Sequence, residues 1–252
     1  MKKLFFVAVA IFLISGIKSN CIAQVKKDTL KILFVGNSYT HTNNLPQIVS
    51  IISDKTNTKL ITKKSTLGGA KLSEHWNGKR GLKTKEIIAN GNFDIVVLQD
   101  HSMATIKEKD SMLKYSRLFC DFIKSKGAKP YLYVTWAREL VPQYQETINS
   151  AYGQIANEKN AKIVPIGDAW ALAKKLRPTI QLFNPDGSHP SEKGTFLTAC
   201  VFVNILTNEL PETPQRYYGT KDKEGESIQL MYVDELNETF LRKVAQEVVD
   251  KN

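Results

Sequence analysis

Five short strand-like runs alternate with stretches of helical periodicity, and this alternation constrains the fold more than any other feature of the chain. The runs cover residues 30–35, 59–66, 93–98, 130–135 and 162–166. Strands that are separated by helices predict a parallel sheet with helices covering both of its faces. We therefore expect an α/β protein with a doubly wound, five-stranded parallel sheet.

The helical stretches lie between and after these runs. Helical periodicity predicts helices over residues 45–53, 72–89 (broken), 110–125, 144–158, 169–176, 191–208 and 233–249. Residues 211–229 are polar and aperiodic, which favours a long surface excursion at the start of a C-terminal helical extension, about 211–252. No repeat, low-complexity segment or long linker divides the chain, so we expect one domain over residues 24–252.

The first 23 residues have the layout of a secretory signal peptide. Lys2 and Lys3 precede an apolar run over residues 4–17, and a small residue, Ala23, stands at the expected cut. This layout predicts export to the periplasm or the extracellular space, with no stable membrane insertion once the signal is removed. Two alternatives stay open: an uncleaved membrane anchor, and a lipoprotein that begins at Cys21.

Composition fits a soluble protein with a well-buried core. Of the 252 residues, 42% are hydrophobic and 24% are charged, and the formal net charge is +10, which falls to +7 without the signal peptide. A basic surface favours acidic partners, but the cations are scattered, so we predict a solvated surface and no nucleic-acid partner. Cys120 and Cys200 lie in apolar helical patterns, which predicts buried free thiols, although a disulfide stays open in an exported protein.

The carboxyl ends of the predicted strands carry most of the polar residues that could do chemistry. In parallel sheets of this kind, ligands bind where the loops after the strands converge. These ends carry Gly36-Asn37-Ser38, Leu67-Gly68-Gly69-Ala70, Gln99-Asp100-His101, Trp136-Ala137-Arg138 and Gly167-Asp168, in chain order. We expect the fragments to share one edge of the sheet.

Ser38 is the candidate nucleophile, and a serine hydroxyl needs a base that removes its proton. His189 has the best placement, because Asp186, three residues earlier, can orient one ring nitrogen and leave the other for a hydroxyl. Pro190 restricts His189 to an extended backbone, and Ser191 can cap the helix that follows. The sequence therefore predicts a loop that presents a catalytic imidazole.

The other three histidines have weaker placements for the same task. His41 is a rival base close to Ser38, but no acid stands near it in sequence to orient its ring. His101 neighbours Asp100, and adjacent residues rarely face each other productively. His75 is interpreted as a rim or structural residue.

The oxyanion of a tetrahedral intermediate needs hydrogen-bond donors. The candidates are the backbone N–H of Ser38, a backbone N–H from Gly68 or Gly69, and the side-chain amide of Gln99. A tight turn would also explain the glycines, and a hydrogen-bonded strand end would also explain Gln99. Their joint placement at successive strand ends is what favours an oxyanion hole.

Together these fragments resemble the four motif blocks of the SGNH (GDSL-type) hydrolase family, over about residues 31–206. The resemblance implies a three-layer α/β/α sandwich of the flavodoxin-like kind and a serine esterase or lipase-type mechanism that uses no cofactor or metal. It implies Ser38 as nucleophile, His189 as base and Asp186 as its orienting acid, with Ser38, Gly69 (or Gly68) and Gln99 around the oxyanion.

Two positions depart from the family pattern. Asn37 stands where the family usually has Asp, and Gln99 stands where it usually has Asn. The extra methylene of Gln99 moves its amide by about 1.5 Å unless the strand adjusts. The role of Gln99 in an oxyanion hole therefore requires that the strand sit further back.

Residues near the strand ends suggest a carbohydrate substrate. Trp136, Arg138, His101 and His75 are the predicted substrate-binding residues, with Trp76 beside them, because an aromatic face with a nearby cation suits a sugar ring. The two tryptophans could equally be packing residues. The predicted substrate is an acylated carbohydrate or other small ester, most simply an acetyl ester.

Two alternative functions stay open: a lysophospholipase or thioesterase-type acyl hydrolase, and a non-catalytic glycan-binding protein. The sequence has no HExxH or HxH pattern and no clustered cysteines, and it lacks the GxGxxG and P-loop patterns, which argues against a metal hydrolase and a nucleotide-binding protein.

Overall fold

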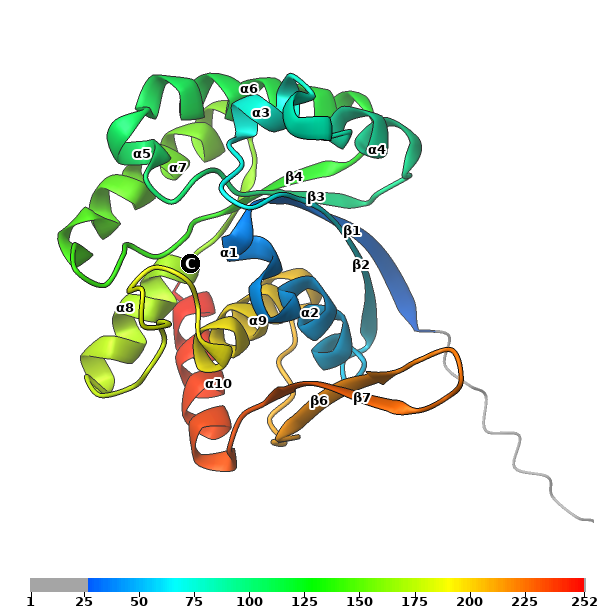
Figure 1. The fold of residues 1–252 in the computed structure, drawn as a ribbon, viewed down its shortest axis with the longest axis vertical. Helices are drawn as coiled ribbons and strands as arrows, with labels where there is room; N and C mark the ends of the chain where they lie inside the picture. The colour runs from blue at the N-terminus through cyan, green and yellow to red at the C-terminus, as the bar shows by residue number, and fades with distance from the viewer. Residues whose placement is uncertain (1–26, 252) are drawn as a thin grey trace, which may run out of the picture.

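The structure is a computed structural model that describes residues 27–251. The predicted signal peptide and Cys21 lie outside these residues. The described chain is built on a five-stranded parallel sheet with the strand order β2-β1-β3-β4-β5 (Figure 1). Its strands are β1 (Asp28–Gly36), β2 (Thr58–Thr66), β3 (Ile95–Leu98), β4 (Lys129–Tyr133) and β5 (Lys162–Val164).

The first strand, β1, lies inside the sheet, where it pairs with β2 on one side and with β3 on the other. Asp28 lies opposite Thr58 and Gly36 opposite Thr66, whereas on the other side Ile32 lies opposite Ile95. Strand order therefore reverses at β1, and loops after β1 and β3 diverge to opposite faces of the sheet. Such a switch point is where open α/β sheets bind ligands, and Ser38 follows directly after β1.

Two layers of helices cover the sheet (Figure 1). Side chains of β1 alternate between two cores, with Ile32 and Phe34 facing one and Leu33 and Val35 facing the other, all fully buried. Both faces of the strand are thus apolar, as a sheet covered on both sides requires. Four helices contribute to the first core: α2 (Leu45–Ser53), α8 (Ile166–Leu176), α9 (Glu192–Thr207) and α10 (Glu235–Val249). Five helices contribute to the second core: α3 (Leu72–Trp76), α4 (Thr84–Asn90), α5 (Ala104–Lys107), α6 (Lys109–Ser125) and α7 (Gln145–Lys159).

This architecture confirms the predicted fold class, a three-layer α/β/α sandwich with a doubly wound parallel sheet. The stretch predicted as a broken helix over residues 72–89 forms α3, a 3₁₀ turn (Lys79–Gly81) and α4. Between β1 and α2 the structure adds a single helical turn, α1 (Ser38–His41), and the 3₁₀ turn Thr42–Asn44. That short turn carries the candidate nucleophile at its first residue.

The polar segment over residues 211–229 is not only a surface excursion, and that prediction is corrected. It contains β6 (Tyr217–Lys221) and the start of β7 (Ser227–Tyr232), an antiparallel hairpin outside the main sheet. Of the hairpin's side chains, only Tyr218 and Met231 are buried. A hairpin with so few inward-facing residues lacks the alternation of apolar and polar residues by which strands are recognised in a sequence.

Cys120 and Cys200 are buried free thiols, as predicted. Cys200 belongs to the core that contains α9, and Cys120 to the core on the opposite face of the sheet. Burial raises the pKa of each thiol to about 12, so both remain protonated near neutral pH. Among residues 27–251, no helix has the length and apolar character that crossing a membrane requires.

Candidate active site

The turn after β1 is fixed by Asn37, which precedes the α1 helix. Its side-chain Oδ1 accepts a hydrogen bond from the Tyr39 N–H at 3.1 Å, and its Nδ2 donates to the Ala70 carbonyl oxygen at 3.0 Å. Capping of this kind satisfies an N–H at the helix start that has no partner within the helix. Asn37 therefore both opens the helical turn and holds it against the loop after β2, with Ser38 at the first helical position.

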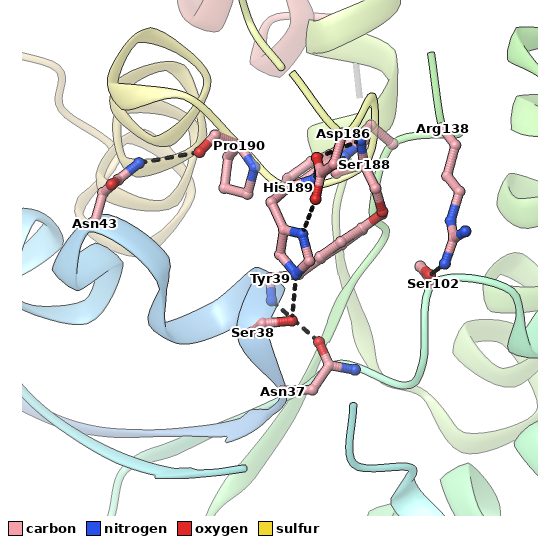
Figure 2. Close-up of polar contacts among 11 residues, drawn as sticks. Asn37, Ser38, Tyr39, Asn43, Ser102, Arg138, Asp186, Ser188, His189 and Pro190 are labelled. Atoms are coloured by element: carbon pink, nitrogen blue, oxygen red, sulfur yellow. Dashed lines mark hydrogen bonds and ion pairs between the residues drawn. The ribbon is translucent and has the colours of Figure 1, made fainter. Parts of the chain in front are cut away.

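The loop that carries His189 is held at several points. The Asn184 N–H donates to the His189 carbonyl oxygen at 2.8 Å, and the Trp136 Nε1–H donates to the Ser188 carbonyl oxygen at 2.9 Å. On the other flank, Asn43 Nδ2 donates to the Pro190 carbonyl oxygen at 3.1 Å (Figure 2). These contacts connect the loop to the segment after β4 and to the turn before α2, so the imidazole is fixed relative to these two segments.

The structure brings together the three residues proposed from the sequence as nucleophile, base and acid (Figure 2). His189 Nε2 lies 2.8 Å from Ser38 Oγ, and His189 Nδ1 lies 2.5 Å from Asp186 Oδ2. Ser38 and His189 are 151 positions apart in the chain. The arrangement lets His189 accept the serine proton at Nε2 while Asp186 holds Nδ1.

Asp186 is further held by backbone groups of its own loop. Its Oδ1 accepts hydrogen bonds from the N–H groups of Ser188 at 3.0 Å and His189 at 2.9 Å. The hydrogen bond from the His189 side chain, aided by these backbone donors, lowers the pKa of Asp186 to about 2. The carboxylate therefore stays ionised at neutral pH and fixes the tautomer of the imidazole.

The rival bases have different surroundings. Burial lowers the pKa of His41, and the nearby Lys64 and His189 lower it further. Burial likewise lowers the pKa of His101, whose Nδ1 accepts a hydrogen bond from the Met103 N–H at 3.3 Å. Within residues 27–251 neither ring hydrogen-bonds a carboxylate, so neither has the orienting acid that His189 has.

The glycine loop after β2 lies against the serine turn. The Leu67 N–H donates to the Gly36 carbonyl oxygen at 3.4 Å, and the Ala70 carbonyl oxygen accepts from Asn37, which places Gly68 and Gly69 beside Ser38. Gly69 has φ of +68°, a conformation that favours glycine. Among the described residues, no acceptor hydrogen-bonds the backbone N–H of Ser38, Gly68 or Gly69. These N–H groups are the candidate donors for an oxyanion.

Gln99 is placed differently from the prediction that its amide lines the oxyanion hole. Its side chain is fully buried, its Oε1 accepts from the Asn37 N–H at 3.0 Å and from Thr40 Oγ1 at 2.8 Å, and its Nε2 donates to the Asp100 carbonyl oxygen. The side chain fits because Gly36 lacks a Cβ, which would stand 2.3 Å from Oε1. The prediction that Gln99 lines the oxyanion hole is wrong: its side chain instead hydrogen-bonds the turn that carries Ser38.

Two predicted substrate-binding residues are also packed inside the protein, and those predictions are corrected. His75 is 1% exposed, with its ring nitrogens 2.6 Å from Thr84 Oγ1 and 2.9 Å from the Gly36 carbonyl oxygen. Trp136 is 1% exposed and stacks on Trp170 with ring centroids 3.8 Å apart. Neither ring can contact a sugar, because other side chains already cover it.

Trp76 shares this packing character, and the other two substrate-binding predictions stay open. The Trp76 ring makes edge contacts with Phe119 and Phe122, with centroids 5.1 and 6.0 Å away. Arg138 and His101 are partly exposed in the loops after β4 and β3. They remain predicted substrate-binding residues.

Two residues that contact the histidine loop or belong to it, Tyr39 and Ser188, were not predicted from the sequence. Tyr39 presents its ring edge-on to His189, with centroids 5.6 Å apart, and stacks on Trp136 at 4.7 Å. Its Oη lies 2.6 Å from Ser188 Oγ. Tyr39 thus packs against the His189 ring and holds the loop that carries it. A tyrosine beside a serine and a serine beside a histidine are too common for sequence alone to assign this contact.

A large cavity among the described residues lies away from the serine and the histidine loop. It has a volume of about 660 Å³ and is lined by the amino-terminal ends of the strands and the end of α9, including Leu30, Lys129 and Lys162. None of the proposed site residues lines it. Among the described residues, no group of three or more His, Cys, Asp or Glu side chains is arranged to hold a metal ion.

No family model and no curated protein matches this sequence. Solved structures do match the fold. A DUF4886-family protein from Bacteroides uniformis is 19% identical over 88% of this chain and 95% of its own, with a TM-score of 0.70. A protein from Slackia heliotrinireducens that is assigned to the SGNH hydrolases is 24% identical over 71% of this chain and 100% of its own, with a TM-score of 0.61.

An acetyl xylan esterase, AlAXEase, also matches the fold, at 15% identity over 70% of this chain and 100% of its own, with a TM-score of 0.51. These proteins share the same sandwich around a parallel sheet. The chain described here therefore has the fold of the SGNH (GDSL-type) hydrolases.

Proposed function

We propose that this chain is an SGNH-type serine esterase that hydrolyses an O-acyl ester, most simply an acetyl ester on a carbohydrate. One observation carries the proposal: His189 Nε2 lies 2.8 Å from Ser38 Oγ while Asp186 holds the other ring nitrogen at 2.5 Å. A hydroxyl, an imidazole and a carboxylate in this order form the arrangement that activates serine in hydrolases of unrelated folds. The fold of the structural neighbours supports the same reaction class.

In the first half of the reaction, Ser38 Oγ attacks the ester carbonyl carbon while His189 Nε2 accepts the hydroxyl proton. The negative charge that develops on the carbonyl oxygen is stabilised by the N–H of Ser38 and by the N–H of Gly69 or Gly68. When the intermediate collapses, the bond to the alcohol breaks and His189 returns its proton to the leaving alkoxide. The products are a free alcohol and an acyl group on Ser38.

The second half of the reaction repeats these steps with water. His189 removes a proton from a water molecule, whose oxygen attacks the acyl carbon on Ser38. Collapse of this second intermediate breaks the bond to Ser38 Oγ, which regains a proton from His189. Asp186 stays ionised throughout and stabilises the imidazolium that forms in each half, consistent with its low pKa.

A small acyl group on a carbohydrate is the proposed substrate for two reasons. The acetyl xylan esterase among the structural neighbours acts on such an ester, and its fold matches that of this chain. Below the triad, Tyr39 and Trp136 stack at 4.7 Å and fill the protein interior, which favours a small acyl group over one buried deep beneath the serine.

The direct test is the release of acetate from acetylated xylan or acetylated pectin by the purified protein. We expect release by the natural chain and none above background by Ser38→Ala. Hydrolysis restricted to long-chain acyl esters would overturn the substrate proposal and favour a lysophospholipase or thioesterase-type enzyme. Glycan binding that is unchanged in Ser38→Ala, with no turnover of a chromogenic acetyl ester, would favour a non-catalytic binding protein.

We also propose that the protein is exported, with residues 1–23 removed as a signal peptide. This proposal rests on the sequence of the first 23 residues alone. Mass spectrometry of the protein from its native host is expected to find a mature chain that begins at Gln24. A chain that begins at a lipid-modified Cys21, or one that retains Met1, would contradict it.

A further inference from the structure

Arg138 extends from the loop after β4 beside the loop that carries Asp186 and His189 (Figure 2). The residues around it are fastened to that loop. The Trp136 Nε1–H donates to the Ser188 carbonyl oxygen at 2.9 Å, and the Glu139 N–H donates to the Gly187 carbonyl oxygen at 2.9 Å. The backbone around Arg138 is therefore fixed against the loop that carries His189, at the same edge of the sheet as Ser38.

The guanidinium of Arg138 is incompletely satisfied by the protein. Its Nη2 donates to Ser102 Oγ at 2.9 Å, in the loop after β3. Its Nε is buried and has no acceptor, and its Nη1 is neither buried nor hydrogen-bonded among the described residues. Within residues 27–251, no carboxylate forms an ion pair with it. One neutral hydroxyl is a weak partner for a partly desolvated cation, which pairs best with an anion.

Arg242 shows what a satisfied arginine looks like in the same protein. Its Nε is also buried without an acceptor, but its Nη1 donates to the Pro211 carbonyl oxygen at 2.6 Å and its Nη2 to Tyr218 Oη at 2.9 Å. Its guanidinium also lies 5.2 Å from the centre of the Phe196 ring. Both outer nitrogens of Arg242 are engaged, whereas Arg138 keeps one outer nitrogen accessible. A missing Nε partner alone therefore marks no site, and the open Nη1 is the distinguishing feature.

Other charges near Arg138 do not neutralise it. Arg138, Lys71 and Lys107 all lower the pKa of the adjacent His101, and Glu108 is the acid that opposes them. Glu108 is already engaged by Lys71, with the two charged atoms 2.5 Å apart. Glu139, the next residue, lies 3.7 Å from Lys174, and Asp186 on the neighbouring loop is engaged by His189, so neither of these acids pairs with Arg138.

We propose that Arg138 binds a carboxylate of the substrate, so that the preferred substrates are acyl esters of acidic sugars such as uronic acids. This inference rests on the proposed esterase function and narrows its substrate class. The open Nη1 and the adjacent nitrogens offer the planar donor set that carboxylates accept, in the loop next to the one that presents His189. The site selects among esters by the charge of the alcohol portion.

A matched pair of substrates tests the proposal: acetylated polygalacturonan, and the same polymer after chemical reduction of its carboxyl groups. For the natural chain, we expect kcat/KM for acetate release to be at least about tenfold higher on the acidic polymer. In Arg138→Gln the ratio of the two values falls toward one, and in Arg138→Lys part of the preference returns because the charge remains. Salt should lower the ratio for the natural chain because it screens the attraction.

The control variant is Lys162→Gln. Lys162 is exposed at the first residue of β5, at the opposite edge of the sheet from Arg138, so its loss removes one positive charge without changing the surroundings of the guanidinium. Its ratio should match that of the natural chain. Equal kcat/KM on the two polymers for the natural chain, or a preference that survives in Arg138→Gln, would overturn the proposal. Inactivity of the natural chain on every ester would instead overturn the proposed esterase function.

Discussion

Two polar clusters in this protein combine a hydroxyl, a carboxylate and a basic side chain, yet their surroundings are opposite. The triad cluster is Ser38, Asp186 and His189, and the C-terminal network is Tyr218, Glu238 and Arg242. The side chains of His189 and Asp186 are 37% and 49% exposed, whereas Tyr218 and Glu238 are 0% exposed. The triad cluster is therefore open to solvent, whereas the C-terminal network is not.

The contacts of the two clusters differ in the same way. Glu238 Oε1 accepts from Tyr218 Oη and from the Arg216 N–H at 3.2 Å, and its Oε2 accepts from the Gln215 N–H at 2.7 Å. The C-terminal network therefore fastens the chain before the β6–β7 hairpin onto α10. In the triad cluster, the hydroxyl and the imidazole face an open edge of the sheet with free N–H groups nearby. Groups that react with a ligand must be accessible. Groups that hold two segments of the chain together are better buried, with each donor and acceptor paired.

Replacing the nucleophile should give the largest change in activity and little change in stability. We expect Ser38→Ala to lower kcat/KM for a chromogenic acetyl ester by at least about 10⁴-fold, since no other group takes the role of Oγ. Thermal unfolding should shift little, because Ser38 is partly exposed. Residual activity within tenfold of the natural chain would contradict the role assigned to Ser38.

Replacing the orienting acid should give the next largest loss. Asp186→Asn keeps the shape of the side chain but removes its negative charge. The amide no longer stabilises the imidazolium of His189 and can present an N–H to its Nδ1–H, so we expect kcat to fall roughly 10²- to 10⁴-fold. Steady-state kinetics on the same ester measure it. Asp28→Asn, which changes an exposed acid at the opposite end of β1 from the serine, is the matched control and should retain kcat. A fall of less than about threefold in Asp186→Asn would show that His189 works without its acid.

A substitution in the C-terminal network should lower the free energy of unfolding and leave kcat unchanged. Glu238→Ala removes the acceptor of the buried Tyr218 Oη and of two backbone N–H groups, and each buried donor left unsatisfied costs about 1–3 kcal/mol. Denaturant unfolding should show this loss, while kcat of the protein that remains folded stays near that of the natural chain. Glu235→Ala, an exposed acid in the same helix, is the control and should shift stability by less than about 0.5 kcal/mol. A specific loss of kcat in Glu238→Ala would remove the distinction between the two clusters.

Asp100 lies between these extremes, as a buried acid at the edge where the triad cluster lies. It is 4% exposed, and burial raises its pKa from 3.8 to about 6, against the hydrogen bonds from the Leu72 and His101 N–H groups. The folded state therefore binds the proton more tightly than the unfolded state does. The resulting stabilisation is fully present below the unfolded pKa of 3.8 and is lost as the pH rises through about 6.

Asp100→Asn removes this titration and should have the smallest effect of the four. A shift of about two pKa units corresponds to about 3 kcal/mol at most. Between about pH 3.5 and pH 7, the unfolding free energy of the natural chain should fall by up to that amount relative to the variant. Denaturant unfolding at several pH values measures the difference. A difference that is constant with pH, or that changes in the opposite direction, would contradict the raised pKa.

The sequence predicted what depends on local pattern. The strands of the sheet have strong apolar runs, and Asp186 and His189 are close enough in sequence for their pairing to be expected. Contacts that depend on packing between distant segments were not predicted. Gln99 lies under the serine turn because Gly36 leaves space for it, and nothing in either residue's own neighbourhood shows this. The sequence does not reveal such a fit between two loops.

Trp136 illustrates the same limit for the substrate site. Its position after a strand suggested an exposed aromatic platform, but Trp170, 34 positions later, stacks on it at 3.8 Å. The hairpin β6–β7 was missed for a related reason, since only Tyr218 and Met231 of its side chains are buried. Where a segment contributes one or two side chains to the interior, its periodicity is too weak to read.

The account depends on an activated hydroxyl at Ser38, and labelling with a serine-reactive fluorophosphonate tests this most directly. Digestion and mass spectrometry of the folded protein should locate one adduct, on the peptide that contains Ser38, and prior unfolding should abolish it. His189→Ala should slow the labelling by orders of magnitude, because the base that takes the proton is gone. A folded protein that gains no adduct at Ser38, or gains one at a different serine, would contradict the central claim.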